Sequence, residues 1–257
     1  MTRTPAARHS FMASPTGRVC LMNARTSIVS GLALDLLRRS AWASTLSEAE
    51  FGAVKSSLIE KSLPADSIVC HLGDPSNHWI GVARGILKTT CFSETGELTT
   101  FIYLTAPEWF GEGALLRNEN RRYEAVAVSD VDLVYIPKAL FTQLAGENIA
   151  FCHALLEQLN LRLSYFITHY DAETSKDPNK RVAQHIVSLY ENYFFENYGS
   201  TFPVSQAELG ALAKLSRQRS NVALRHLKEQ GLIDVGYGTI TVLDIERLRS
   251  FCGAATP

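Results

Sequence analysis

The segment from Ser205 to Gln230 restricts the fold of this chain more than any other stretch. Ser205 followed by Glu208 is spaced as a capping box, which predicts the start of a short helix with an apolar face. A tight turn follows, and Ser216 is placed to cap a second helix that Gly231 ends. The segment therefore predicts two helices joined by a very short turn.

The second of these helices has two chemically different faces. Its core-facing positions, at i, i+3, i+4 and i+7, are Ser220, Ala223, Leu224 and Leu227. Its opposite face carries only donors able to reach base edges or phosphates, namely Arg217, Gln218, Asn221, Arg225 and Lys228. Five basic residues against two acidic ones between 205 and 230 leave a local charge of +3, although the whole chain carries −1. This concentration of positive charge predicts a DNA-binding helix.

The residues that follow add a second mark of the same class of domain. The runs LIDV, GYG and TITVL predict a strand, a glycine-containing turn and a second strand, which is the wing of a winged helix-turn-helix. Taken alone, the charged stripe is more typical of a solvated helix face on an α+β domain. Together with both caps, the turn and the wing it favours DNA contact. The predicted DNA-binding residues are Ser205, Ser216, Arg217, Gln218, Arg219, Asn221, Arg225 and Lys228.

Short strands dominate the middle of the N-terminal half. From Ser30 to Ser62 the pattern is helical, with a second capping box at Ser47 and Glu50. From Ser67 to Ile136 short apolar runs such as SIVCHL, LTTFIYL and DLVYIP alternate with polar turns. Six or more strands at nearly regular spacing predict an antiparallel roll or barrel that can enclose a small ligand.

A long helix is predicted to follow the roll and to serve as a dimer seam. Apolar positions recur at spacings of 4, 3, 4, 3 and 4, which is the a/d rhythm of a two-stranded coiled coil. They are Cys152, Leu156, Leu159, Leu163, Phe166 and Tyr170. A second apolar edge at Phe151, Leu155 and Ile167 would pack on the helix's own domain. The polar run 171–179, which contains Pro178, is interpreted as a hinge.

Composition sets the broader limits. With 257 residues, 46% hydrophobic and 20% charged, the chain is long enough for two modest domains. Its five scattered cysteines are odd in number and form no CxxC pair, so a reducing, cytoplasmic location is expected. No apolar run reaches 18 residues, which argues against a membrane-spanning helix. The basic, aperiodic N-terminus is interpreted as a disordered leader, with a targeting or DNA-touching arm as the alternative.

The predicted fold class is α+β, with an antiparallel β-roll, a long dimerisation helix and a winged helix-turn-helix. The expected boundaries are 1–30 for the leader, 31–146 for a β-roll sensor domain, 147–174 for the dimerisation helix and 175–257 for the DNA-binding domain.

Three motifs in this order resemble the CRP/FNR family of bacterial transcription factors, the cyclic-AMP receptor and fumarate-nitrate regulator family. They are WFGEGALL at 109–116, AVAVSDVDLVYIP at 125–137 and LSRQRSNVALRHLKEQGLI at 215–233, and the resemblance covers roughly residues 34–251. It implies a β-roll sensor that resembles cyclic-nucleotide-binding jelly rolls, a dimerisation helix and a winged helix-turn-helix, and this order agrees with the periodicity. It also implies that Arg217 contacts guanine, whereas Gln218 replaces the glutamate that is common at the next position.

The resemblance further implies an effector site at Gly111, Glu112, Gly113, Arg121 and Arg122. In nucleotide-binding members the Gly-Glu pair contacts phosphate and ribose, and an arginine followed by Ser or Thr holds the cyclic phosphate. Arg122 occupies that Ser/Thr position, which disfavours cyclic AMP. Because neighbours in a strand face opposite sides, only one of the two arginines would then point inward. A ligand-free sheet edge, cyclic di-GMP, another nucleotide and an unrelated effector stay open, with cyclic di-GMP first among the ligands because two arginines suit two phosphates.

The sequence gives little support for a haem, a metal site or an enzyme active site. Cys70, His71 and His78 near the early strands are the only residues that suggest haem, and we predict neither a metal site nor catalytic residues. A metal-dependent enzyme of the small-barrel class and a ligand-binding module without DNA function are the alternatives. The favoured hypothesis is a homodimeric regulator whose partners are a near-palindromic double-stranded operator and RNA polymerase.

Overall fold

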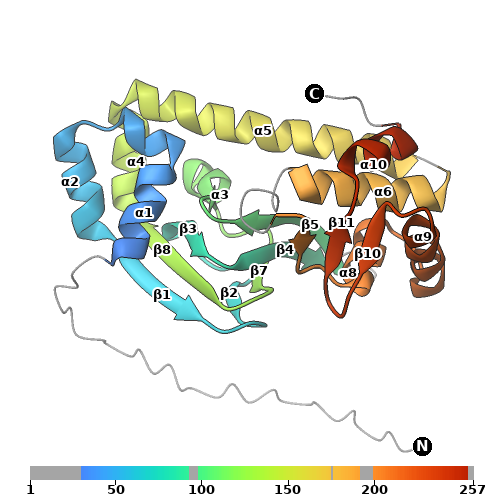
Figure 1. Cartoon of the computed structure of the whole chain (residues 1–257). Coiled ribbons are helices and arrows are strands. Elements are labelled where there is room, and N and C mark those ends of the chain that lie inside the picture. Colours follow the sequence, from blue (N-terminus) through green and yellow to red (C-terminus); the bar gives the residue numbers. More distant parts are fainter. Residues whose placement is uncertain (1–29, 93–97, 175, 192–198, 254–257) are drawn as a thin grey trace, which may run out of the picture.

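The computed structural model describes residues 30–92, 98–174, 176–191 and 199–253. Figure 1 shows a sheet-rich N-terminal half and a mostly helical C-terminal half lying side by side, with the long helix α5 (Ile149–Thr174) running along both. The order of a β-roll, a long helix and a winged helix-turn-helix confirms the predicted α+β class.

Three short helices precede the roll. They are α1 (Gly31–Arg39), the 3-10 helix η1 (Ala41–Thr45) and α2 (Glu48–Ser57). The capping box predicted at the start of α2 is confirmed, since Ser47 and Glu50 exchange hydrogen bonds. The prediction of helix up to Ser62 was wrong, because β1 (Ile59–Leu63) is a strand paired with β8. This strand is largely exposed and has no apolar alternation, so its pairing partner, not its sequence, defines it.

The roll consists of two four-stranded antiparallel sheets, as predicted. One has the order β1-β8-β3-β6 and the other β2-β7-β4-β5. The remaining strands are β2 (Ile68–Cys70), β3 (His78–Arg84), β4 (Ile86–Phe92), β5 (Leu98–Thr105), β6 (Trp109–Phe110), β7 (Glu124–Ala127) and β8 (Val131–Pro137).

An aromatic cluster joins the roll to the long helix. The rings of Trp42, Trp79 and Trp109 lie with their centroids 4.8–5.1 Å apart, and Phe151 of α5 stands 5.7 Å from Trp42. All four side chains are buried. Because aromatic side chains bury large apolar areas, this cluster fixes the first turns of α5 against the sensor domain, beside α4 (Lys138–Glu147).

The C-terminal half is built around α6 (Pro178–Leu189). A three-stranded sheet, α8 (Gln206–Leu212), α9 (Arg217–Glu229) and α10 (Ile245–Cys252) complete it. The sheet has the order β10-β11-β9, formed by Ile233–Val235, Ile240–Val242 and Thr201–Phe202. The hinge predicted for 171–179 is partly wrong, because α5 continues to Thr174 and α6 already begins at Pro178, a residue favoured in the first helical turn.

Candidate DNA-binding and effector sites

Two caps and one glycine hold the helix pair α8–α9 together. The predicted capping box at Ser205 and Glu208 is confirmed, and the Ser216 hydroxyl accepts from the Arg219 amide at 3.5 Å. A Cβ added at Gly210 would stand 3.1 Å from the buried Ser220 side chain. Sequence reasoning missed this glycine, whose missing side chain lets α9 lie close against α8.

The donor face of α9 points away from the core. The residues expected inside, Ser220, Ala223, Leu224 and Leu227, are all buried. Of the predicted DNA-binding residues, Ser216, Arg217, Gln218, Arg219, Arg225 and Lys228 are exposed, and Asn221 and Ser205 are half-buried. Lys228 alone among them forms an ion pair in the described structure, with Asp234 of β10 at 2.6 Å. The other cationic side chains of this face are displayed to solvent.

The wing adds a side chain that sequence reasoning did not single out. Tyr237 lies at the tip of the turn between β10 and β11 and is fully exposed. Gly238 has a φ of +69°, a left-handed conformation that glycine adopts without strain and that closes the turn. A fully exposed tyrosine at the tip of the wing offers stacking and hydrogen bonding to a ligand that reaches this turn.

The two neighbouring arginines of the candidate effector site face opposite directions. Arg121 is 4% exposed, and its Nη2 donates to the His78 carbonyl at 2.6 Å. Its Nη1 has no hydrogen-bond partner in the described structure. Arg122 is exposed and pairs with Glu119 at 2.9 Å. Only one arginine therefore points into the roll.

The Arg121 guanidinium lies directly on Gly111. A Cβ at Gly111 would stand 1.8 Å from Nη1, and the residue has a φ of +93°, so both the space and the conformation call for glycine. Gly111 caps the short helix α3 (Glu112–Arg117), and Gly113 lies half-buried in its first turn. The predicted motif thus places the buried Arg121 guanidinium, which has one nitrogen without a hydrogen-bond partner, beside the backbone of Gly111.

Glu112 is already engaged by other parts of the molecule. Its carboxylate is 3% exposed, accepts from Trp79 Nε1 at 3.3 Å and forms an ion pair with Arg162 of α5. Arg162 also donates to the Trp109 carbonyl. A carboxylate buried this deeply needs such a partner. The loop that carries the effector motif is therefore bonded to the long helix.

Arg121 lies near two neutral groups, the Cys70 thiol and the Tyr123 hydroxyl, and near the charges of Glu112, Arg162, Asp74 and Glu124. Burial raises the pKa of the Cys70 thiol, and burial together with Glu112 raises the pKa of Tyr123 to about 12, against the opposing effect of Arg121 on both groups. Both groups therefore keep their protons at neutral pH. His71 lies outside on the surface, 3.1 Å from Glu124. Within the described ranges, no group of three or more His, Cys, Asp or Glu side chains is arranged to hold a metal, and no helix is long and apolar enough to cross a bilayer.

The proposed seam of α5 is open to solvent in the single chain. Leu156, Leu163 and Phe166 are 60%, 56% and 41% exposed, while Cys152 and Leu159 are half-buried. The side chain of Tyr170 lies outside the described set. Phe151 and Leu155 are buried against the sensor domain, as the second apolar edge predicted, whereas Ile167 is exposed.

Comparisons with known proteins identify both halves of the chain. Residues 60–148 match the family model of the cyclic nucleotide-binding domain, and residues 180–251 match the Crp-like helix-turn-helix domain. The cyclic AMP receptor protein of Thermus thermophilus is 28% identical over 179 residues, which cover 70% of this chain and 81% of that protein. The regulator Vfr of Pseudomonas aeruginosa, named as cAMP-activated, is 23% identical over 184 residues, which cover 69% and 86%.

Solved structures share the fold at lower identity. FixK2 of Bradyrhizobium japonicum superposes with a TM-score of 0.68 at 18% identity and covers 77% of this chain and 99% of its own. CLP of Xanthomonas campestris, described as a c-di-GMP responsive global regulator, has a TM-score of 0.63 at 18% identity and covers 77% and 100%.

The fold and the two matched domains define the class: a regulator that joins a cyclic nucleotide-binding roll to a DNA-binding helix-turn-helix. The chain belongs to the CRP/FNR family of transcriptional regulators.

Proposed function

We propose that this protein is a homodimeric, sequence-specific regulator that inserts α9 of each subunit into successive major grooves of a near-palindromic operator. The exposed donor face of α9 carries this proposal. Arg217 and Gln218 stand in the first turn of α9, and the first turn of a recognition helix is the part that reaches base edges. Arg225, two turns further along, is proposed to contact a phosphate.

The exposed leucines of α5 support the dimer. Three seam residues, Leu156, Leu163 and Phe166, are each more than 40% exposed in the single chain, whereas Phe151 and Leu155 on another side of α5 are buried. A contiguous apolar stripe of this kind is costly in water, and a second copy of the same helix buries it with a/d spacing. Replacing Leu163 with Asp is expected to give a monomer by analytical ultracentrifugation. A dimer that survives this substitution at low micromolar concentration would remove the seam from the proposal.

The effector proposed for the roll is a nucleotide with one cyclic phosphate. Arg121 is buried with an unused N–H, and a buried charged donor without an acceptor is unfavourable by about 1–3 kcal/mol or more. A phosphate at this position would accept that hydrogen bond. The sequence-based preference for cyclic di-GMP relied on two arginines acting together, but Arg122 is paired with Glu119 outside. Single-phosphate messengers therefore come first, in keeping with the names of the curated relatives.

Signalling would pass through the pair of Glu112 and Arg162. A ribose hydroxyl bound to Glu112 has to share this carboxylate with the guanidinium of Arg162 or displace that guanidinium. Arg162 lies on the proposed dimerisation helix. The ligand thereby acts on α5, and through α5 on the two DNA-binding domains. Contact of the DNA-bound dimer with RNA polymerase, and a cytoplasmic location, belong to the same proposal.

Selection from a random-sequence oligonucleotide pool tests the DNA role. The expected result is enrichment of an inverted repeat with half-sites about one helical turn apart, bound more weakly as salt rises. Binding without enrichment of any sequence would contradict base recognition.

Calorimetric titration with cyclic AMP, cyclic GMP and cyclic di-GMP tests the effector. The expected result is sub-millimolar affinity for one of the two single-phosphate nucleotides and weaker binding of cyclic di-GMP. If all three bind more weakly than about 1 mM, the roll works without a nucleotide of this class.

A further inference from the structure

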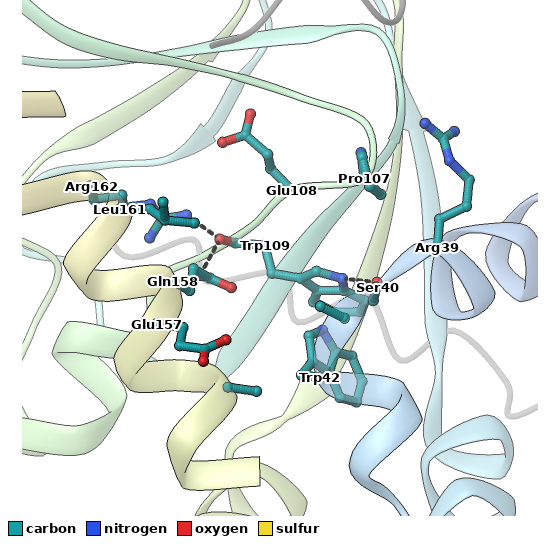
Figure 2. Close-up of a pocket in the computed structure, with 12 residues that line it drawn as sticks. Arg39, Ser40, Trp42, Pro107, Glu108, Trp109, Glu157, Gln158, Leu161 and Arg162 are labelled. Carbon is teal, nitrogen blue, oxygen red and sulfur yellow. Dashed lines mark hydrogen bonds between the residues drawn. The ribbon is translucent and has the colours of Figure 1, made fainter. Parts of the chain in front are cut away.

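A cavity of about 410 Å³ lies where η1, the turn before β6 and the middle of α5 meet (Figure 2). Its lining carries both signs of charge, from Arg39 and Arg162 as well as from Glu108 and Glu157. Arg162 is also the ion-pair partner of Glu112 in the loop that carries the effector motif, so this cavity is not independent of the candidate nucleotide site. An independent feature lies on α9, in the other half of the molecule (Figure 1).

The donor face of α9 contains one exposed apolar side chain. Val222 is 59% exposed, whereas Leu224 and Leu227, the other large apolar residues of this helix, are buried. A single exposed valine is ordinary on a protein surface. Its position on the helix therefore decides whether it has a role.

Val222 lies on the side of α9 that faces away from the core, together with two of the predicted DNA contacts. Successive residues of an α-helix are about 100° apart, which places Val222 about 150° from the centre of the buried side. That side is formed by Ser220, Ala223, Leu224 and Leu227. Val222 lies only about 40° around the axis from Gln218 and about 60° from Arg225, both of which are exposed. The three side chains therefore form one continuous strip, with the valine between the two polar residues along the axis.

A strip of this kind has to meet both polar and apolar groups on its target. Gln218 and Arg225 offer donors, but the side chain of Val222 can make no hydrogen bond. In the major groove the bases display donors and acceptors, and the 5-methyl group of thymine is the apolar exception. A polar base edge covered by valine would lose water without gaining a partner, whereas the methyl groups of thymine and valine would leave water together.

The valine side chain is also held in place before DNA binds. Two methyl groups on Cβ leave one strongly preferred rotamer in a helix, so little side-chain freedom is lost on contact. Because the side chain is short, it can contact a base only where α9 lies deep in the groove. The N-terminal part of a recognition helix lies there, and Val222 is in the second turn of α9.

We propose that Val222 is a specificity-determining residue that recognises the 5-methyl group of one thymine in each half-site. This role rests on the proposed function, because it requires α9 to lie in the major groove. Val222 stands five residues after Arg217, which is about 7.5 Å along the helix axis. Base pairs are about 3.4 Å apart, so the thymine is expected about two base pairs from the base that Arg217 contacts.

Removal of single methyl groups from the operator tests this role. The full-length protein first selects an operator from a random-sequence pool, with and without cyclic AMP or cyclic GMP. Each thymine of the operator is then replaced by deoxyuridine, in both half-sites at once. Deoxyuridine keeps every hydrogen-bonding group of thymine and lacks only the 5-methyl group. Fluorescence anisotropy is expected to show an affinity about tenfold lower when the thymine opposite Val222 is replaced.

Two variants assign this loss to Val222. Val222→Ala removes the two methyl groups and keeps a good helix former, so the difference between thymine and deoxyuridine at that position should fall below about twofold. Ile149→Ala, which shortens another exposed aliphatic side chain at the start of α5, should retain a difference of about tenfold. Unchanged far-ultraviolet circular dichroism spectra show that both variants are folded.

Two results would overturn the role of Val222. One is a selected operator in which no thymine responds to the loss of its methyl group. The other is a Val222→Ala variant that discriminates thymine from deoxyuridine as well as the wild type does. Both leave the proposed function intact, since a selected inverted repeat already demonstrates sequence-specific binding. A pool from which no sequence is enriched contradicts the proposed function and the role of Val222 together.

Discussion

Lys88 of the sensor sheet and Glu208 of the helix-turn-helix form an ion pair across the two halves of the molecule. The Nζ of Lys88, on β4, lies 2.9 Å from Oε1 of Glu208, in the first turn of α8. Both side chains are about four-fifths buried. The other oxygen of Glu208 closes the capping box with Ser205. One carboxylate thus starts the first helix of the DNA-binding unit and fastens that unit to the sensor.

A double-mutant cycle should measure this link. Lys88→Met removes the cation, and Glu208→Gln keeps an N-terminal capping group but removes the anion. Because the pair is only partly screened by water, each single substitution is expected to lower the free energy of unfolding by about 1–2 kcal/mol, with a coupling energy of about 1 kcal/mol. Urea denaturation of the four proteins gives these values. Additive effects would mean that Lys88 and Glu208 do not stabilise each other in solution.

The same pair carries a pH dependence at the acidic end. Burial raises the pKa of Glu208, but hydrogen bonds from Ser205 and Lys88 and the charge of Lys88 outweigh burial, so the pKa is lowered overall. A lowered folded-state pKa contributes stability above the unfolded value of about 4.3, and this contribution is lost as pH falls through the folded value. The stability difference between wild type and Glu208→Gln should therefore shrink below pH of about 4. A difference that is constant down to pH 3 would contradict the lowered pKa.

Glu108 should give the opposite pH dependence of the unfolding free energy. Withdrawal from water raises its pKa to about 7, against the hydrogen bond from Thr105 and the charge of Arg162, while Glu112 adds to the rise. A raised folded-state pKa contributes stability that is full below the unfolded value and is lost as pH rises through about 7. Between pH 5 and 8 the wild type should lose roughly 1–3 kcal/mol of unfolding free energy relative to Glu108→Gln. Parallel pH profiles for the two proteins would show that Glu108 titrates normally.

The two arginines of the effector motif should differ sharply in nucleotide binding. Arg121→Met replaces the buried guanidinium with an apolar chain of similar length and should weaken nucleotide affinity at least about tenfold, since it removes a charged donor from the phosphate. Arg122→Met alters only the surface pair with Glu119 and should leave affinity within about twofold. Calorimetry on both variants gives the comparison. Equal losses would show that both arginines reach the ligand.

Two basic residues of the recognition helix α9, Arg217 and Lys228, should differ in their effect on DNA binding. Arg217→Ala is expected to cost about 1–3 kcal/mol on the selected operator and to relax the preference at one base position. Lys228→Ala should weaken every sequence alike and by less than about 1 kcal/mol, because Asp234 already holds this ammonium at 2.6 Å. Fluorescence anisotropy against the operator and against single-base variants distinguishes the two. A uniform loss across all sequences for Arg217→Ala would argue against base contact.

The local features of this fold could be predicted from the sequence. The capping boxes at Ser47 and Ser205, the buried stripe of α9 and the two strands of the wing depend on residues a few positions apart, and helical or strand periodicity determines which side of an element is apolar. The strand Ile59–Leu63 was not predicted, because it forms only by pairing with β8, which lies about 70 residues further along the chain.

The sequence by itself determined the order of the elements, their caps and their apolar faces. Only the tertiary structure decided that Arg121 turns inward while Arg122 turns out, that Glu112 meets Arg162, and that Lys88 meets Glu208. The cavity between η1 and α5 is likewise a product of packing. The physical reason is that a side chain's partner across 50 or 120 residues depends on how whole elements pack together, and the spacing of residues within one element carries no record of that packing.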